Sequence, residues 1–349
     1  MHPEPTFSAA VVGYGWAAAA HIDAINATGL ARVTAVCSSR NLDPAELSAR
    51  HGGKIQVWTS LEPMLAQSGA GVVSLCSYPS RRREEALAVA QAGKHLIIEK
   101  PLALSLRDCT DILEAVEAAG IQACVCFECR YSNQFLVTRA VIDAGLLGEI
   151  HYGEVDYYHG IGPWYGQFRW NISREEGGSS LLSAGCHALD ALLLCLNGEV
   201  ESVFSAATAS RSAIFAPYRY PTTSSTILQF TDGRVGKAAS VIDCLQPYYF
   251  HTHLVGSRGS LLDRRLHSEE LALDKSSWSE LSMKLLDSGD VSDHPYEAQF
   301  RAFFTALSEN KPMPLTSLRE AYRSFEIVFA ADRSSEKRRL VTLEEMRNP

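Results

Sequence analysis

The sequence lacks an excess of basic residues and lacks long apolar runs. Its 349 residues hold 32 Lys and Arg against 40 Asp and Glu, a net charge of −8. Proteins bind a nucleic-acid backbone through clustered basic side chains, so we expect no nucleic-acid partner. No apolar run reaches the ~18 residues that span a membrane, and no charged segment followed by an apolar one resembles a signal peptide. We therefore predict a cytoplasmic protein that does not bind membranes.

Metal-binding patterns are also scarce. Cysteine occurs nine times, an odd count. Cys124, Cys126 and Cys129 lie close together, but the first two share one face of a predicted strand, so we expect reduced core cysteines in a cytosolic protein. His251 and His253 also share a strand face, and two ligands do not make a metal site. We predict no metal.

The chain changes character near residue 130. Before it, short apolar strands at 7–12, 32–37, 55–58, 71–76, 96–98 and 123–127 alternate with helices, which is typical of an α/β domain with a doubly wound parallel sheet of the Rossmann type. After it, longer segments alternate with period two, and a hairpin is expected at 226–241. We predict a second, α+β domain with a large, open, mostly antiparallel sheet. The domains are expected at 1–128 and 129–349, with the final helices able to pack back on the first.

The most informative stretch follows the first predicted strand, where residues 13–18 read Gly-Tyr-Gly-Trp-Ala-Ala. This G-x-G-x-x-A spacing gives a tight turn, close backbone approach to a pyrophosphate, and a helix N-terminus with free N–H groups. The same turn also serves as a packing device, so the motif alone leaves both interpretations open. The residues expected to contact a nucleotide are Gly13, Tyr14, Gly15, Trp16 and Ala17.

A second motif, Glu99-Lys100-Pro101, ends a predicted buried strand. Doubly wound folds place ligand-contacting groups at such strand ends, and a lysine there can donate to a hydroxyl or carbonyl oxygen. The proline can lock the turn, often with a cis bond. A surface salt bridge is the competing interpretation.

A third motif begins with Gly177-Gly178 and continues through Ser183, His187 and Asp190, with a helix expected at 184–195. The spacing allows the last three side chains to lie along one helical face. A histidine near neutral pKa suits proton transfer from a sugar hydroxyl. A buried histidine satisfied by Asp190 is the alternative, but the two glycines favour close backbone approach to a ligand.

The three motifs together resemble the glucose–fructose oxidoreductase/inositol dehydrogenase/MocA (Gfo/Idh/MocA) family, and the resemblance extends over nearly the whole chain. It implies a two-domain NAD(P)-dependent oxidoreductase acting on sugars, cyclitols or related polyols. Lys100 matches the family lysine that contacts the reacting hydroxyl, and His187 matches the histidine of the substrate site. The family's second domain supplies the substrate pocket and commonly an oligomer interface through its open sheet face, which implies a homodimer or homotetramer.

Two departures from the family pattern affect the site. Many members carry an aspartate where this chain has Ser183, so a proton relay has to run through His187 with Lys100, with the ribose hydroxyl as an optional third member. Many also carry Cys-Thr-Pro-Asn and then a histidine, where this chain has Cys76-Ser77-Tyr78-Pro79 and then Arg82. The further residues expected around the cofactor are Ser77, Tyr78, Pro79, Arg82, Glu99, Lys100, Pro101 and Glu128.

Cofactor choice is predicted from the end of the second strand. An acid there binds the ribose 2′-hydroxyl of NAD, whereas an arginine accommodates a 2′-phosphate. Here the strand is followed by Ser38-Ser39-Arg40 without an acid. Asp43 comes later, before Pro44, where an N-cap is the simpler interpretation. We predict NAD(P) with a preference for NADP(H), although small loop shifts still allow NAD.

An aromatic segment at 163–171 precedes the Gly-Gly motif. Carbohydrate rings stack on aromatic rings, and Arg and Asn side chains bind their hydroxyls. A hydrophobic plug between domains or a subunit contact is the competing interpretation. The family resemblance also implies that Arg130 and Tyr131, at the junction between the two domains, face the substrate. The predicted substrate residues are Lys100, Arg130, Tyr131, Trp164, Tyr165, Arg169, Trp170, Ser183 and His187.

Three functions remain open from the sequence. The leading one is a dehydrogenase that moves a hydride between a nicotinamide and a ring carbon of a sugar, glycoside or cyclitol, with Lys100 and His187 managing the hydroxyl proton. The second is an NAD-dependent glycosidase that oxidises C3, eliminates the aglycone, adds water and reduces again. The third is a non-catalytic sugar- or nucleotide-sensing regulator, against which the presence of Lys100 and His187 argues.

Overall fold

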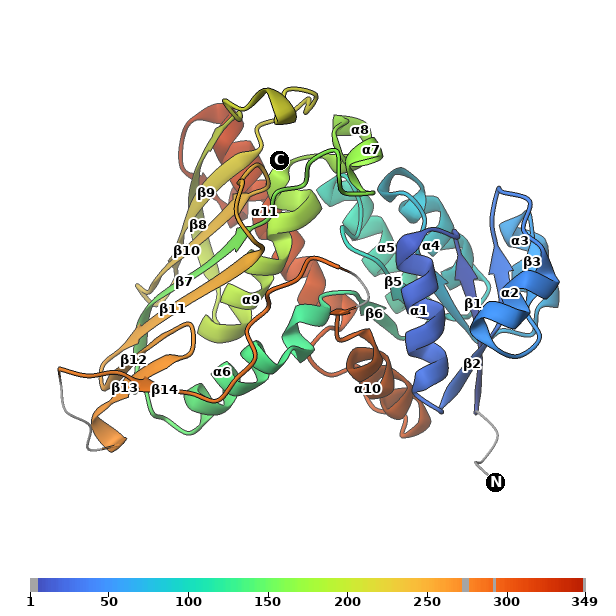
Figure 1. Cartoon of the computed structure of the whole chain (residues 1–349), viewed down its shortest axis with the longest axis horizontal. Helices are drawn as coiled ribbons and strands as arrows, with labels where there is room; N and C mark the ends of the chain where they lie inside the picture. The colour runs from blue at the N-terminus through green and yellow to red at the C-terminus, as the bar shows by residue number, and fades with distance from the viewer. Residues whose placement is uncertain (1–5, 272–275, 291–292, 348–349) are drawn as a thin grey trace. The chain divides into compact units, whose positions relative to one another are not determined.

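The computed structural model describes residues 6–271, 276–290 and 293–347 (Figure 1). Its contacts divide the chain into two compact units. The first is Met1–Glu128 with Asp290–Tyr322, and the second is Cys129–Gly289 with Arg323–Pro349. The chain therefore leaves the first unit once and returns to it for one segment before it ends in the second.

The first unit contains a six-stranded parallel sheet in the order β3-β2-β1-β4-β5-β6. The strands are β1 (Phe7–Val12), β2 (Ala31–Cys37), β3 (Gln56–Trp58), β4 (Val72–Leu75), β5 (His95–Ile98) and β6 (Ala123–Val125). The helices between them are α1 (Trp16–Ala27), α2 (Pro44–His51), α3 (Leu61–Gln67), α4 (Arg82–Gln91) and α5 (Leu106–Ala118). The predicted doubly wound sheet is confirmed. Its strand order reverses between β1 and β4, and ligands bind at such a switch point in this fold.

Helix α10 (Tyr296–Ser308) also belongs to the first unit, although it follows most of the second unit in the sequence. It packs on α1, where the Phe300 ring lies edge-on to His21 with centroids 4.9 Å apart. Its Gln299 donates a 2.8 Å hydrogen bond to the carbonyl of Val125, the last residue of β6. The Val125 N–H donates to the carbonyl of Thr316. Strand β6 ends at Val125, two residues earlier than predicted.

The second unit contains a nine-stranded sheet in the order β14-β13-β12-β11-β7-β10-β9-β8-β15. Every pair is antiparallel except β7 with β10. The strands are β7 (Ile150–Tyr158), β8 (Val200–Thr208), β9 (Thr223–Phe230), β10 (Val235–Val241), β11 (Tyr249–Gly256), β12 (Gly259–Leu262), β13 (Arg265–Ser268), β14 (Ser279–Glu280) and β15 (Val341–Thr342). The predicted open, mostly antiparallel sheet is confirmed, as is the hairpin, which joins β9 to β10.

One face of this sheet is covered by helices, with α9 (Cys186–Leu196) packed on β7 and β10 and α6 (Asn133–Asp143) beside it (Figure 1). Gly153 permits this approach, because a Cβ there would lie 2.9 Å from Leu196. Side chains alternate along each strand, so the residues next to Gly153 point to the opposite face. That outer face includes Phe204 and Ile227, which are 48% and 43% exposed.

The helical stretch that leads into α9 begins irregularly. Leu181–Gly185 form a π-turn (η3), and α9 starts at Cys186 rather than at the predicted residue 184. Gly185 is needed here, since a Cβ would collide with Ser240 of β10. Within the described residues, Arg174–Leu196 is long and apolar enough to cross a membrane by length and composition, but 89% of its apolar window is buried in the protein, as in a core helix.

The nine cysteines form no disulfide bonds, as predicted, and seven of them are buried. Cys126 and Cys129 have the C-x-x-C spacing found in redox pairs, and they too are thiols. Burial raises the pKa of Cys124 to about 12. The thiols therefore behave as small apolar core groups.

Candidate functional site

The glycine turn after β1 has the form that a phosphate requires. Gly13 has φ +86°, and a Cβ there would lie 2.9 Å from the carbonyl oxygen of Cys76, so only glycine fits between the ends of β1 and β4. Gly15 precedes the first residue of α1, and no described atom lies within 4 Å of the position its Cβ would take. Among the described residues no side chain caps α1. The helix start therefore presents backbone N–H groups beside open space, which fits the pyrophosphate of a dinucleotide.

The end of β2 supplies a second part of this nucleotide-facing site. The Arg40 guanidinium lies over the Tyr14 ring, 5.8 Å from its centroid. The Tyr14 hydroxyl is 3.0 Å from Nε2 of His51, which fixes the ring. Ser38 accepts a hydrogen bond from the Arg40 N–H. Asp43 accepts from the N–H of Ala45 and caps α2, so the simpler interpretation of this acid is confirmed.

Arg82 lies inside the first unit rather than at its surface. It is 4% exposed, and it donates to the carbonyl oxygens of Pro101 and Ser77. Ser77 in turn donates to the carboxylate of Glu85. Arg82 was predicted around the cofactor, and its hydrogen bonds tie together the loops that follow β4 and β5. Two other predicted cofactor residues lie between Ser77 and Arg82 in the sequence. Of these, Tyr78 is exposed and Pro79 is buried.

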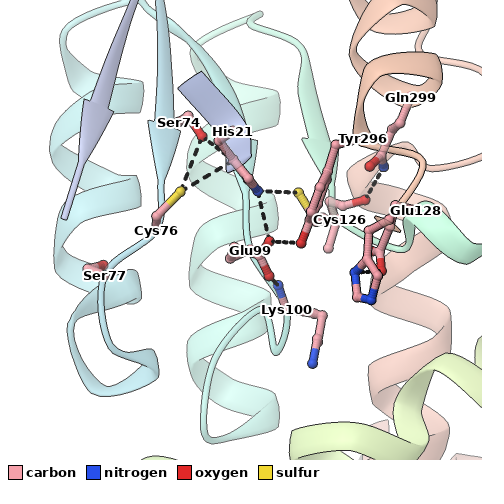
Figure 2. A network of polar contacts seen from close by, with 12 residues as sticks. His21, Ser74, Cys76, Ser77, Glu99, Lys100, Cys126, Glu128, Tyr296 and Gln299 are labelled. Atoms are coloured by element: carbon pink, nitrogen blue, oxygen red, sulfur yellow. Dashed lines mark hydrogen bonds and ion pairs between the residues drawn. The ribbon is translucent and has the colours of Figure 1, made fainter. Parts of the chain in front are cut away.

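A buried polar network lies under the Glu99-Lys100-Pro101 motif (Figure 2). Nε2 of His21 is 2.8 Å from a carboxylate oxygen of Glu99, and Nδ1 is 2.8 Å from the Ser74 hydroxyl. The Tyr296 hydroxyl donates to the same Glu99 oxygen at 2.6 Å. The other Glu99 oxygen accepts from the Lys100 N–H at 3.0 Å. The alternative of a surface salt bridge is therefore wrong, because Glu99 is 5% exposed and its partners lie in the core.

The network stabilises a buried ion pair. Burial opposes the imidazolium form, but contacts with Cys76 and Glu99 outweigh it and raise the pKa of His21 to about 10. Burial likewise opposes the carboxylate, yet hydrogen bonding and charge from His21 hold the pKa of Glu99 well below its usual range. The sequence did not single out His21, Ser74 or Tyr296, since each contributes only through contacts distant along the chain.

Lys100 is held by its backbone while its side chain extends away. The Lys100–Pro101 peptide bond is cis, as predicted. Figure 2 shows the ammonium end of this half-buried lysine directed away from His21 and Glu99. Glu128, also predicted around the cofactor, is 1% exposed, and its carboxylate lies 3.0 Å from Nδ1 of His294.

The second unit positions His187 and Ser183 at the start of α9. Both are buried, His187 within α9 and Ser183 in the π-turn that precedes it. A ring nitrogen of His187 and the sulfur of Cys129 lie within 4.8 Å of each other. Ser183 lies in the π-turn and His187 in the regular helix, and the alignment of their side chains along one helical face stays a prediction.

Asp190 and Arg130 form a buried ion pair within the second unit. Nε and an Nη of Arg130 donate to the two carboxylate oxygens of Asp190, each at 2.7 Å. The Ser324 hydroxyl adds a third hydrogen bond at 2.6 Å. Arg130, predicted to bind substrate, is 4% exposed, and this pair anchors α9 through Asp190. Tyr131, beside it in the sequence, is only partly exposed.

An aromatic pocket of about 450 Å³ lies in the second unit. Its lining residues are His159, Gly160, Trp164, Tyr165, Cys244, Leu245, Gln246, Pro247 and Tyr248. His159 forms its centre, with ring centroids 4.8 Å from Tyr165 and 5.1 Å from Tyr248. The structure thus brings Trp164 and Tyr165 together. Arg169 and Trp170 are not among the described lining residues, and the sequence missed His159 and the segment 244–248.

These features define a two-domain nucleotide-dependent oxidoreductase. Residues 7–127 match the family model of oxidoreductases with an NAD-binding Rossmann fold, and residues 135–262 match the GFO/IDH/MocA C-terminal domain. The chain belongs to the GFO/IDH/MocA family, and the predicted resemblance is confirmed.

Several characterised proteins are similar to this chain. Myo-inositol 2-dehydrogenase of Thermotoga maritima is 21% identical over 96% of the chain and 98% of that protein. D-glucoside 3-dehydrogenase of Escherichia coli is 30% identical over 47% of the chain and 46% of that protein. The chain spans about half the length of this relative and of an uncharacterized oxidoreductase of Synechocystis. A levoglucosan dehydrogenase structure, in complex with NADH and levoglucosan, has TM-score 0.81 at 19% identity over 96% of the chain and 98% of that chain.

Proposed function

We propose that this protein is a cytoplasmic NAD(P)-dependent dehydrogenase that acts on a ring hydroxyl of a sugar, glycoside or cyclitol. The proposal rests on the geometry of Lys100. The buried Glu99 fixes its backbone, and its ammonium group is directed away from Glu99 (Figure 2). Anchoring of this kind suits a group that must meet a substrate oxygen in one geometry. Family membership and the phosphate-binding turn support the same function.

The roles of the residues follow from their chemistry. Gly13 and Gly15 would hold the pyrophosphate of a nicotinamide dinucleotide, which would supply the hydride exchange with the substrate carbon. Lys100 donates to the reacting oxygen, which favours loss of the hydroxyl proton during oxidation. His187 accepts that proton, and Ser183 replaces a carboxylate with a neutral hydrogen-bonding group. In this proposal the unit of Met1–Glu128 with Asp290–Tyr322 binds the nucleotide, and the unit of Cys129–Gly289 with Arg323–Pro349 binds the substrate.

The proposed substrate is a cyclic carbohydrate, and a pyranose or a glycoside is the favoured class. The pocket of about 450 Å³ is lined by Trp164, Tyr165 and Tyr248, whose faces suit the C–H faces of a sugar ring. Two relatives support this class: their names identify a D-glucoside dehydrogenase and a dehydrogenase bound to levoglucosan.

NADP(H) is the preferred cofactor in this proposal. Arg40 and Ser39 follow β2 where a 2′-phosphate would lie, and Asp43 is occupied by its capping hydrogen bond. Two neighbouring structures, those of WlbA of Bordetella pertussis and of levoglucosan dehydrogenase, are NADH complexes, so NAD(H) is the alternative to be tested. The exposed apolar residues Phe204 and Ile227 on the outer sheet face support assembly into a dimer or tetramer.

The function is tested by incubating the purified protein with NAD⁺ or NADP⁺ and a panel of free pyranoses, aryl glycosides and cyclitols. Reduced nicotinamide should accumulate with at least one pyranose or glycoside. Release of the aglycone without that accumulation would instead identify the glycosidase. Nucleotide binding without either reaction would favour the regulator.

A further inference from the structure

The outer face of the nine-stranded sheet carries a polar cluster on its two central neighbours, β7 and β11. Glu154 on β7 stands directly opposite His253 on β11, and Asp156 stands opposite His251. These side chains point away from α9, because Gly153, the residue before Glu154, faces that helix and side chains alternate along a strand. The cluster is therefore separate from His187, which α9 carries on the other side of the sheet.

Three potential metal ligands meet in this cluster. One ring nitrogen of His251, one of His253 and a carboxylate oxygen of Glu154 all lie within 4.8 Å of one another. The histidines are two residues apart on one strand, and their ring centroids are 6.4 Å apart. Glu154 is far away in the sequence, which is why the two histidines alone gave no basis for predicting a metal.

The cluster also has the outer contacts that orient metal ligands. Asp263 lies 3.2 Å from Nδ1 of His251, and it is itself fixed by hydrogen bonds from the Tyr249 hydroxyl at 2.6 Å and the Thr252 N–H at 3.0 Å. A carboxylate on one ring nitrogen selects the tautomer that leaves Nε2 able to bind a metal. Tyr152 donates to one oxygen of Glu154 at 3.1 Å and holds that carboxylate in place.

The charges of the cluster favour a dication. The carboxylates of Glu154, Asp156 and Asp263 are accompanied by one ammonium group, that of Lys237, which lies 2.6 Å from both Glu154 and Asp156. The three carboxylates and one ammonium group leave two negative charges in excess. Lys237 can remain on Asp156 when a cation takes Glu154.

We propose that Glu154, His251 and His253 bind one divalent transition-metal ion on the outer face of the sheet, with Zn²⁺ the best match. Two imidazoles and one carboxylate form a common zinc ligand set, and water completes a four-coordinate site. The ion links β7 to β11 and so stabilises the centre of the sheet. Its position on the face opposite α9 excludes a part in hydride or proton transfer at His187.

The test uses the full chain after removal of metals with a chelator. Calorimetric titration with Zn²⁺ should show a single tight equivalent, and Zn²⁺ should raise the unfolding temperature, because a ligand that binds only the folded state stabilises it. Co²⁺ in place of Zn²⁺ should give the intense visible bands of a four- or five-coordinate ion, which loosely bound surface cobalt does not give.

Variants locate the ion. His253→Gln and Glu154→Gln should each weaken Zn²⁺ binding by more than the ~10–100-fold that follows loss of an outer partner, and Asp263→Asn should fall within that range. His151→Gln, at an exposed position on the same strand β7, should bind like the original protein. The thermal midpoint of each metal-free variant shows that it is folded.

Two results would overturn the proposal. One is the absence of a tight equivalent in the original protein. The other is its retention in both His253→Gln and Glu154→Gln, which would place the ion elsewhere, for example at Cys129 and His187. Because the readout is metal binding, failure of this site leaves the proposed dehydrogenase function untouched.

Discussion

Tyr296 donates its hydroxyl hydrogen to Glu99 at 2.6 Å, although the two residues are 197 positions apart in the sequence. The bond connects α10, which enters the first unit late in the chain, to the strand end that carries Lys100 (Figure 2). One carboxylate oxygen of Glu99 thus accepts hydrogen bonds from both Tyr296 and His21, while the other accepts one from the Lys100 backbone N–H. The position of Lys100 therefore depends on α10. Any displacement of the segment that carries this helix would remove the Tyr296 hydrogen bond from Glu99.

Tyr296→Phe should lower both stability and turnover. It removes one hydrogen bond to a buried carboxylate, so the free energy of unfolding should fall by about 1.5–3 kcal/mol. Turnover should fall while the KM for the nucleotide changes little, since Lys100 is displaced and the glycine turn is not. Denaturant unfolding and steady-state kinetics check the two effects. Equal losses in turnover and nucleotide affinity would show that the substitution simply disturbs the domain.

The His21–Glu99 pair makes stability depend on pH in a defined direction. The pKa of His21 is raised to about 10 in the folded protein, against ~6.5 for an unperturbed histidine. Its stabilising effect is therefore complete below the unfolded value and is lost as pH rises from about 6.5 through 10. His21→Gln should be less stable at neutral pH and should show a weaker alkaline decline. Chemical unfolding measured between neutral and alkaline pH checks this, and parallel declines in the two proteins would contradict it.

The sequence predicted the first domain well because its signals are local. Each parallel strand is a short apolar run, and the turn at Gly13 and Gly15 has a fixed spacing that follows from phosphate geometry. The Glu99-Lys100-Pro101 motif is local as well, because it directly follows the last residue of β5. The antiparallel hairpin was predicted for the same reason, since its turn and its alternation are contained in one segment.

The remaining features depend on contacts that sequence spacing does not reveal. Arg82 and Arg130 stand beside recognisable motifs, which suggested ligand contacts; both are buried, and both donate hydrogen bonds to neighbouring protein oxygens. Tyr248 joins the aromatic pocket only because the chain between β10 and β11 folds next to His159. Leu181–Gly185 form a π-turn in which Gly185 closely approaches Ser240 of β10, a contact that sequence spacing does not reveal.

Lys100→Met should abolish turnover and preserve nucleotide binding. The substitution removes the ammonium group but keeps the length of the side chain, and loss of a positioned proton-transfer group typically costs 10²- to 10⁴-fold, so a drop of roughly 10³-fold is expected. Lys94→Met is a matched control, because Lys94 is half-buried just before β5 and donates to the carbonyl of Ala70. Turnover and nucleotide fluorescence titration check the result. Unchanged turnover in Lys100→Met would remove the lysine from the mechanism.

Arg40→Ala should weaken NADP(H) binding selectively. The Arg40 guanidinium lies over Tyr14 and is the predicted partner of the 2′-phosphate, so the KM for NADP(H) should rise about 10-fold or more while that for NAD(H) changes little. Arg50→Ala, at an exposed position in the last turn of α2, controls for loss of positive charge. Direct binding titrations with both nucleotides check the difference. Equal weakening of both would contradict a role for Arg40 in reading the phosphate.

Trp164→Ala should raise the KM for a sugar or glycoside with little change in nucleotide affinity. Trp164 is 62% exposed, yet its indole N–H donates to the carbonyl of Gly160 at 3.1 Å, which fixes the ring at the edge of the aromatic pocket. A stacked ring contributes about 0.5–1.5 kcal/mol beyond its buried area, so an increase in KM of roughly 10-fold is expected. Trp278→Ala is the control, since Trp278 is 43% exposed and lies under Arg265 away from the pocket. Steady-state kinetics with glycosides of increasing size should show a larger effect for larger aglycones. A uniform loss with every substrate, or an equal loss in Trp278→Ala, would mean that the pocket does not bind the sugar.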